Sequence, residues 1–443
     1  MTLLTEPEAP VRAPHPLRAE AVRGFAPWAG AAVLLTLGVP LWAKADRWQG
    51  GWAETADQLH TALLITLPLA AAAGCWQGGR ERRRGTEELW GTTVRPPLTR
   101  LLVAALPVVL WVTAGYLVTA ALALLATWPY AQGDRPHPAV LPGDTVAMAA
   151  GALAGHVVGR VVATRLAAPL LAMAGYVGLG IVAAGGSPAG RALSPATGAL
   201  DGALPVWWQP WAMAVWTGGL ALAAALAYAA RRRVTALLPL AAALSAGALL
   251  AQAGDGLWHT DPLGRRQVCD TSTTPAVCVN ARYAGMLPQV GEALSGITDK
   301  LHGVRNLPVR WADHGSAPRA GEAQLPGITP LGWSAVRGRL TDPRQYAWQA
   351  VTALQGYDCP ETTLTARVLR ADDAVEHYLA PSPVQKAIDE DDARGDAARR
   401  AGLRERRAAR ARLAGMDERQ RRDWLSAYFG ARAGCDPKEV PAL

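Results

Sequence analysis

Seven long apolar stretches divide the first 253 residues of this chain and limit its possible folds more than any other feature. A hydrocarbon core about 30 Å thick needs roughly 20 residues of α-helix, because each helical residue rises about 1.5 Å. Stretches near this length predict membrane spans at residues 25–43, 58–76, 101–127, 144–163, 167–185, 209–229 and 234–253. Half of the residues are hydrophobic, which agrees with a membrane protein. We therefore expect a mainly α, polytopic helical bundle of about seven spans.

The basic residues predict which loops face the cytoplasm, because Lys and Arg beside short loops stay on that side of the membrane. If the N-terminal segment at residues 1–24 is inside, the cytoplasmic segments hold 14 arginines and the opposite loops hold four basic residues. The membrane domain would then cover residues 25–253. An odd number of spans places residues 254–443 outside the cell as a separate domain.

The cysteines give an independent indication of sidedness. Cys269, Cys278, Cys359 and Cys435 follow the last predicted span, whereas Cys75 lies in the second span. Thiols in an oxidising exterior compartment pair, and four cysteines allow three pairings. We expect Cys269 to pair with Cys278 in a short local loop and Cys359 to pair with Cys435. A four-thiolate zinc site is the rival interpretation, although no Cys-x-x-Cys pair occurs.

The C-terminal domain is expected to be mostly helical, with strands at residues 309–313 and 364–371 (an α+β domain). Two groups in it could bind a metal: a cluster of Asp372, Asp373, Glu376 and His377, and the acidic run at residues 389–392. They have no second histidine or cysteine at ligand spacing, so solvated helix starts are expected here in preference to a metal site. The arginines of residues 394–422 predict a long exposed helix or a surface for anionic lipids. Nucleic acid is not an expected partner, because aromatic residues are not interleaved with the arginines.

Glycines in the fourth predicted span indicate close helix packing. Gly151, Gly155 and Gly159 recur every four residues and form one bare ridge, on which a second helix can approach closely within the subunit. His156 and Arg160 are four residues apart and share a helix face. His156 is either a buried packing residue or a residue of a transport pathway. No Asp, Glu or Lys is expected deep in any span, which disfavours an ion-coupled transporter.

A densely charged insert at residues 77–100 follows the second predicted span. Thr86 is predicted to be the N-cap of a short helix, with Glu87 and Glu88 in the first turn, where the helix dipole favours negative charge. The less polar face of this helix is expected to consist of Leu89, Trp90 and Thr93. Prolines follow and end the helix. The insert is therefore expected to be a short amphipathic helix at the cytoplasmic surface of the membrane.

The order Glu81, Gly85-Thr86, Glu88 and Thr93 resembles the loop after the second span in permease subunits of ABC-2 type transporters, as in actinobacterial-like ABC exporters. The resemblance covers about residues 20–230. It implies that the insert is a coupling helix that docks onto a separate ABC ATPase in the bacterial plasma membrane. Trp90 replaces the usual Leu of that family. Members of that family usually have six spans and a C-terminus inside the cell. A seventh span and a C-terminal domain outside the cell depart from this plan.

The resemblance implies a dimer with a second permease copy or a sister permease, surrounded by membrane lipids. ATP and Mg²⁺ would be bound by the ATPase, because this chain has no Gly-x-x-x-x-Gly-Lys-Ser/Thr loop. The expected function is therefore the membrane subunit of an ATP-driven exporter, without cofactors or catalytic residues of its own. The alternatives are a membrane-anchored exterior enzyme or sensor, with its activity in residues 254–443, and immunity by sequestration.

Overall fold

The chain folds into two compact units in the computed structural model. The structure describes residues 21–22, 24–86, 96–136, 138–162, 164–197, 203–314, 319–328, 334–355 and 359–443. The first unit, here called the membrane unit, comprises Met1–Lys44, Thr55–Leu125 and Pro136–His259. The second, here called the C-terminal unit, comprises Ala45–Glu54, Ala126–Arg135 and Thr260–Leu443. The C-terminal unit therefore includes two segments that connect helices of the predicted membrane domain, which the sequence did not predict.

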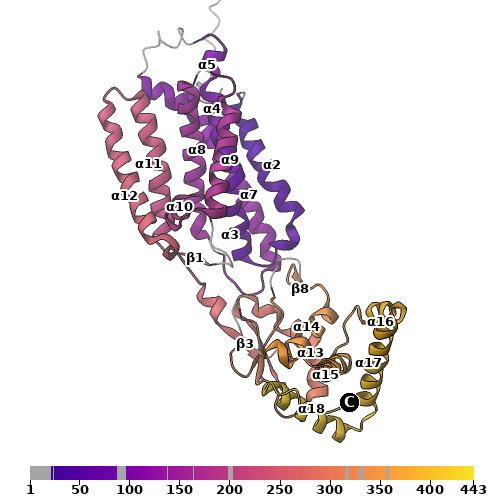
Figure 1. The fold of residues 1–443 in the computed structure, drawn as a ribbon. Coiled ribbons are helices and arrows are strands. Elements are labelled where there is room, and N and C mark those ends of the chain that lie inside the picture. Colours follow the sequence, from indigo (N-terminus) through magenta and orange to yellow (C-terminus); the bar gives the residue numbers. More distant parts are fainter. Residues whose placement is uncertain are drawn as a thin grey trace, which may run out of the picture. The chain divides into compact units, whose positions relative to one another are not determined.

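The membrane unit is a bundle of apolar helices, and Figure 1 shows α4, α8, α11 and α12 running alongside one another. Its helices are α2 (Ala26–Ala43), α3 (Trp52–Thr61), α4 (Leu63–Gly78), α5 (Arg80–Arg83), α7 (Pro97–Thr127), α8 (Leu141–Val161), α9 (Ala167–Gly185), α10 (Pro188–Leu193), α11 (Gln209–Ala229) and α12 (Leu237–Ala253). The first three residues of α3 belong to the C-terminal unit. A two-residue pair, β1 (Leu204–Pro205) with β2 (Trp258–His259), also lies in the membrane unit.

Within the described residues, five helices are long and apolar enough to cross a membrane. These candidate spans are Ala26–Ala43, Pro97–Tyr130, Ala167–Gly185, Gln209–Ala229 and Arg233–Leu257. The pair α3 and α4, bent by 43°, passes the same test together and would be a sixth span. The fourth predicted span, residues 144–163, falls in α8, which does not pass the test, because Asp144, His156 and Arg160 lower its hydropathy. The chain is thus a mainly helical protein with the features of a membrane protein.

The C-terminal unit combines a small sheet with helices. Its four-stranded sheet has the order β3 (Gln267–Asp270), β4 (Ala276–Asn280), β5 (Arg310–Ala312) and β6 (Glu322–Gln324). Strands β3 and β4 are antiparallel, whereas β4, β5 and β6 are parallel to one another. A two-stranded pair consists of β7 (Ala335–Val336) and β8 (Arg339–Leu340). The predicted strand at residues 309–313 is thus present as β5.

Helices supply most of the C-terminal unit, in agreement with the mostly helical α+β class. They are α13 (Leu287–Leu301), α14 (Pro343–Gln355), α15 (Ala366–Leu379), α16 (Gln385–Arg394), α17 (Ala397–Gly415) and α18 (Glu418–Ala433). The predicted strand at residues 364–371 is wrong, because α15 begins there with the Thr365 side chain accepting a hydrogen bond from the Val368 N–H. Trp311, Tyr346, Tyr428 and Phe429 are fully buried in the core of this unit. Burial of these rings removes a large apolar area from water and stabilises the unit.

Both predicted disulfides are present. Cys269 and Cys278 lie directly opposite each other on β3 and β4, with Cα atoms 4.0 Å apart. Cys359 and Cys435 join with Cα atoms 5.5 Å apart and tie the C-terminal residues to the segment that precedes α15. The four-thiolate zinc site is therefore excluded, since all four sulfur atoms are consumed in bonds. Cys75 is buried in α4 as a free thiol.

Candidate functional site

The charged segment that follows α4 is a short helix closed by a glycine turn. Helix α5 (Arg80–Arg83) is closed by Gly85, two residues after its end, whose φ of +67° is in the left-handed region that glycine adopts without strain. The Gly85 N–H donates to the Arg82 carbonyl and the Thr86 N–H donates to the Glu81 carbonyl, both at 3.1 Å. These two bonds are the Schellman motif that ends helices. Gly85 and Thr86 therefore cap the helix before them.

The predicted N-cap role of Thr86 concerns a helix that lies outside the described residues. The Thr86 hydroxyl is used within the preceding turn, where it is 3.3 Å from the Glu81 carbonyl oxygen. Five of the predicted ATPase-coupling residues, Glu87, Glu88, Leu89, Trp90 and Thr93, also lie outside the part of the chain that the structure describes.

The Glu81 side chain is bound to the end of α8. The Arg160 guanidinium donates to both Glu81 carboxylate oxygens, with Nη2 2.9 Å from Oε1. Arg82 adds a hydrogen bond from its Nη2 to the Arg160 carbonyl at 2.7 Å. The two paired side chains are only 14% and 16% exposed, so water competes weakly with this bidentate ion pair. Two consecutive residues of α5 thus hold α8.

The three glycines of α8 lie against α4. A Cβ atom on Gly155 would be 1.9 Å from the Ala71 carbonyl oxygen, and one on Gly159 would be 2.0 Å from that of Cys75. A Cβ on Gly151 would meet the Leu67 side chain at 2.6 Å. The opposite helix contributes its own glycines, since a Cβ on Gly74 would be 1.9 Å from the Ala152 carbonyl oxygen. The backbones of α4 and α8 therefore touch along a seam that has no room for a side chain at these glycines.

His156 lies on this seam. Its side chain is buried, with 1% of the residue exposed, and its ring nitrogens have no hydrogen-bond partner among the described residues. Its carbonyl oxygen would be 2.2 Å from a Cβ on Gly78. Burial in a tight helix contact fits the packing interpretation of His156, and its place in a transport pathway stays a prediction.

A buried polar cluster that the sequence did not reveal joins three helices of the membrane unit. Asp144 Oδ1 on α8 lies 2.8 Å from His60 Nδ1 on α3, and the Tyr116 hydroxyl on α7 donates to Asp144 Oδ2 at 2.9 Å. All three residues are at most 6% exposed. Asp144 is at the predicted start of the fourth span, where an acidic residue would be expected to be exposed to solvent. Its partners are 84 and 28 residues away, so no local pattern could indicate the contact.

A second buried cluster lies in the C-terminal unit and joins its connecting segments to the residues after β4. The Arg282 guanidinium and the Tyr283 hydroxyl both donate to Glu54 Oε1, at 3.0 Å and 2.5 Å. Asp134 Oδ2 accepts hydrogen bonds from the N–H groups of Trp52 (2.6 Å) and Ala53 (3.1 Å), and so caps the first turn of α3. These bonds hold residues 45–54 and 126–135 in one unit with residues 260–443.

Asp134 makes this cluster sensitive to pH. Burial and the nearby Glu54 carboxylate raise the pKa of Asp134 from 3.8 to about 7, although the N–H bonds from Ala53 and Trp52 oppose the shift. The folded unit therefore holds a proton that the unfolded chain releases near its ordinary pKa. Consequently, this carboxyl makes the unit less stable as the pH rises from about 4 to about 7.

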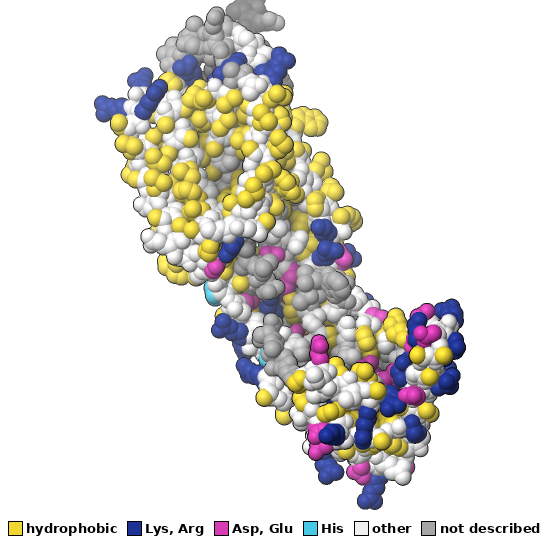
Figure 2. All heavy atoms as spheres, in the orientation of Figure 1, with side chains coloured by type: hydrophobic (Ala, Val, Ile, Leu, Met, Phe, Trp, Pro, Cys, Tyr) yellow, Lys and Arg dark blue, Asp and Glu magenta, His cyan; other side chains and the backbone are white. Residues whose placement is uncertain are grey.

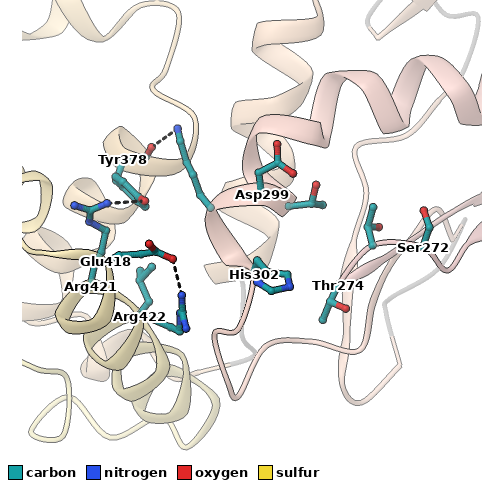
Figure 3. Close-up of a pocket in the computed structure, with 12 residues that line it drawn as sticks. Ser272, Thr274, Asp299, His302, Tyr378, Glu418, Arg421 and Arg422 are labelled. Atoms are coloured by element: carbon teal, nitrogen blue, oxygen red, sulfur yellow. Dashed lines mark hydrogen bonds and ion pairs between the residues drawn. The ribbon is translucent and has the colours of Figure 1, made fainter.

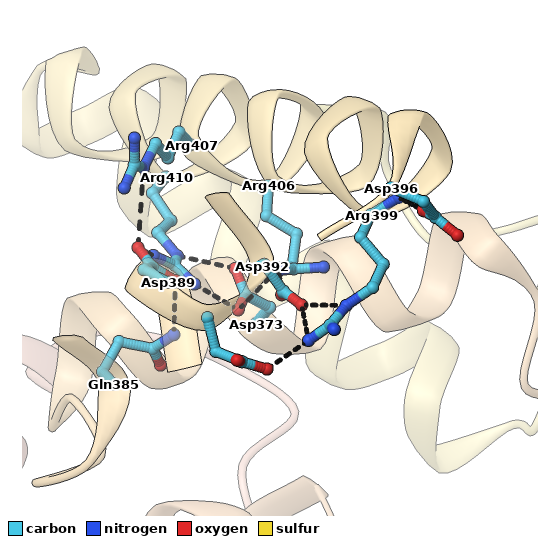
Figure 4. A network of polar contacts seen from close by, with 10 residues as sticks. Asp373, Gln385, Asp389, Asp392, Asp396, Arg399, Arg406, Arg407 and Arg410 are labelled. Carbon is cyan, nitrogen blue, oxygen red and sulfur yellow. Dashed lines mark hydrogen bonds and ion pairs between the residues drawn. The ribbon is translucent and has the colours of Figure 1, made fainter. Parts of the chain in front are cut away.

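The acidic groups of the C-terminal unit pair with its arginines (Figure 4). Arg410 on α17 is held by Asp373 at 2.7 Å and by Asp389 at 2.8 Å, and its side chain is 6% exposed. Asp392 accepts from Arg406 and Arg399 in the same way. Among the described residues no group of three His, Cys, Asp or Glu side chains is placed to hold a metal ion. The arginine-rich stretch, predicted to form a long exposed helix, is therefore largely exposed but has an internal face at Arg410.

An open pocket of about 660 Å³ lies in the C-terminal unit (Figure 3). Its cations are largely bound within the fold, since Lys300 donates to the Tyr378 and Leu379 carbonyls and Arg421 donates to the Leu413 and Ala414 carbonyls. Three hydroxyl groups of its wall donate within their own loop or helix: Ser272 to Asp270, Thr273 to the Pro275 carbonyl and Thr298 to the Ser295 carbonyl. This arrangement holds helix ends together and does not form a hydrogen-bonded pair of nucleophile and base.

No known protein family, curated protein or solved structure matches this chain.

Proposed function

We propose that this chain is the permease subunit of an ABC-2 type exporter in a bacterial plasma membrane, driven by a separate ABC ATPase. The observation that carries the proposal is the bidentate ion pair between Glu81 and Arg160. It links the segment that resembles a coupling helix to α8, and the glycine seam links α8 to α4. A displacement of this segment would therefore move two closely packed helices together, which is what a transport subunit without its own ATPase requires.

The contents of the C-terminal unit support the proposed sidedness. Residues 45–54 and 126–135 connect helices at the ends opposite the arginine-rich loops, and they belong to one unit with residues 260–443. Two disulfides fit an oxidising compartment for that unit. We place it outside the cell, with the N-terminus in the cytoplasm and α8 as a seventh span whose polar residues are shielded by protein. The transport path would be formed with a second permease copy or a sister permease.

Reversing the charges of the Glu81–Arg160 pair tests whether it relays motion. We expect Glu81→Arg and Arg160→Glu to lower the ATP turnover of the co-reconstituted ATPase by about tenfold each, which is the factor for ~1.4 kcal/mol of lost coupling. The double variant restores an ion pair and should recover most of the turnover. The measurement is ATP hydrolysis in lipid nanodiscs, with thermal stability recorded for each variant. A double variant as impaired as either single variant, at unchanged stability, would count against a relay through this pair.

A further inference from the structure

Helix α17 has arginines on two sides, and only one side is used within the fold. Its sequence has seven arginines and one acidic residue, Glu405, which Arg370 of α15 binds at 2.6 Å. Figure 4 shows Arg399, Arg406 and Arg410 pointing from α17 toward the carboxylates of α15 and α16 that they bind. These ion pairs therefore lie on the side of α17 that packs on α15 and α16.

The other side of α17, here called its outer face, holds Arg400, Arg404 and Arg412. All three are exposed, and residues 359–443, which the structure describes without a gap, supply no acidic partner to any of them. The Arg400 guanidinium donates to the Gly395 carbonyl, which leaves its charge in place. Because a helix has about 3.6 residues per turn, the three positions lie within about 120° of one another around the axis. In Figure 2, Lys and Arg side chains gather over α16 and α17.

The spacing of these arginines indicates the shape of an anion that would contact all of them. Arg400 and Arg412 are about 18 Å apart along the helix axis, because each residue rises about 1.5 Å. Ala408 and Ala411 are the exposed residues between Arg404 and Arg412 other than Arg407 and Glu405, so short side chains separate the charges. A single small anion reaches one arginine of this row, whereas a linear polyanion reaches all three at once and gains from the linked contacts.

The composition of the outer face indicates the chemistry of the polyanion. Guanidinium groups match phosphate oxygens in geometry as well as charge. Helices that bind membranes carry large apolar residues beside their basic face, whereas the exposed residues of α17 are Arg, Ala, Glu and Gly. Proteins that bind single-stranded nucleic acids stack the bases on aromatic side chains, which the α17 sequence lacks. A phosphate polymer without acyl chains or bases therefore fits this face best.

We infer that the outer face of α17, formed by Arg400, Arg404 and Arg412, binds a linear polymer whose units are joined by phosphate groups. The ion pairs of Arg410 with Asp373 and Asp389 hold α17 against α15 and α16, so the row of arginines is fixed before the polymer binds. The inference rests on the charge and exposure of α17 and not on a partner ATPase. Its failure is therefore distinguishable from failure of the proposed transport function.

Binding of fluorescently labelled inorganic polyphosphate to the full chain in nonionic detergent tests the inference, by fluorescence anisotropy at several salt concentrations. Wild type should bind this polymer more tightly than orthophosphate. The triple variant Arg400→Gln, Arg404→Gln and Arg412→Gln should lose about tenfold in affinity, as expected for three exposed ion pairs of ordinary strength. The slope of log affinity against log salt concentration should also become shallower by about 2, since each phosphate contact to a single strand contributes about 0.7.

The matched control is the triple variant Arg265→Gln, Arg319→Gln and Arg344→Gln. It removes the same charge from exposed positions in three other segments of the C-terminal unit and should bind polyphosphate as wild type does. Both triple variants should keep the wild-type melting temperature, because substitutions of exposed side chains have small effects on stability.

Four results would overturn the inference. An equal loss of affinity in the control variant would assign the binding to the overall charge of the unit. Orthophosphate binding as tight as polyphosphate binding would show that the row of arginines is not used as a row. Equal affinity for polyglutamate would remove the preference for phosphate. Displacement of polyphosphate by phosphatidylglycerol at the same phosphate concentration would assign the outer face to lipid headgroups.

Discussion

Gly155→Val is expected to prevent the membrane unit from folding. The new Cβ would lie 1.9 Å from the Ala71 carbonyl oxygen and 2.9 Å from the Ala71 Cα, both of which are backbone atoms that no rotamer change can move. Helices α4 and α8 would have to separate along the whole seam, and the other glycine contacts of that seam would be lost with it. We expect the yield of monodisperse protein in detergent chromatography to fall about tenfold or more, as the cost exceeds ~1.4 kcal/mol.

The control for this prediction is Gly178→Val in α9, where a Cβ atom would meet nothing within 4 Å. Both substitutions add the same side chain to a helical glycine, so they differ only in the neighbouring backbone. Gly178→Val should give wild-type yield and melting temperature. A Gly155→Val protein that matched it in both measurements would contradict the close contact between α4 and α8.

Arg410→Ala is expected to destabilise the C-terminal unit strongly. Arg410 is nearly buried and holds Asp373 and Asp389 together, so its removal leaves these two carboxylates with only longer ion pairs, to Arg406 (3.9 Å) and Arg407 (3.6 Å). Breaking a buried ion pair on one side costs about 3–5 kcal/mol. The measurement is limited proteolysis of the full chain at increasing temperature. In the variant, cleavage between residues 366 and 415 should begin at a lower temperature than in wild type.

Arg404→Ala is the matched control for this second prediction, because Arg404 is exposed on the same helix, α17. The same charge and a side chain of the same size are removed there, so the two proteins differ only in the loss of the ion pairs. The free energy of unfolding of Arg404→Ala should be within about 0.5 kcal/mol of the wild-type value. Similar protease resistance of the two variants would show that the pairs of Figure 4 do not hold α15, α16 and α17 together.

Long-period features of this chain could be predicted from its sequence, because they depend on composition over many residues. Apolar runs near 20 residues gave the helices that could cross a membrane, and the cysteines beyond the last run gave both disulfides. Short windows were less informative. Residues 364–371 alternate well enough to be read as a strand, yet the Thr365 N-cap signal begins a helix there.

The parts of the candidate site that escaped prediction are contacts between residues far apart in the chain. Glu81 was selected as a docking residue, whereas its carboxylate is bound to Arg160, 79 residues away. Asp144 is buried only because α3 and α7 supply His60 and Tyr116. The arginines of α17 read as an exposed surface because their partners lie on α15 and α16. The spacing of residues within one helix does not indicate which other helix a side chain contacts. These contacts could therefore be identified only from the three-dimensional structure.

The most direct test of the central proposal is whether an ABC ATPase binds the segment that contains Glu87 and Glu88. The full chain is co-expressed with a candidate ATPase from a neighbouring gene, and the amount of ATPase that co-purifies is measured. Glu87→Lys with Glu88→Lys should reduce it at least about tenfold, as expected for reversing two charges at a docking surface. Glu361→Lys with Glu439→Lys, the same change at exposed sites of the C-terminal unit, should have no effect. Equal co-purification with both double variants would contradict the proposal that this segment couples the chain to an ATPase.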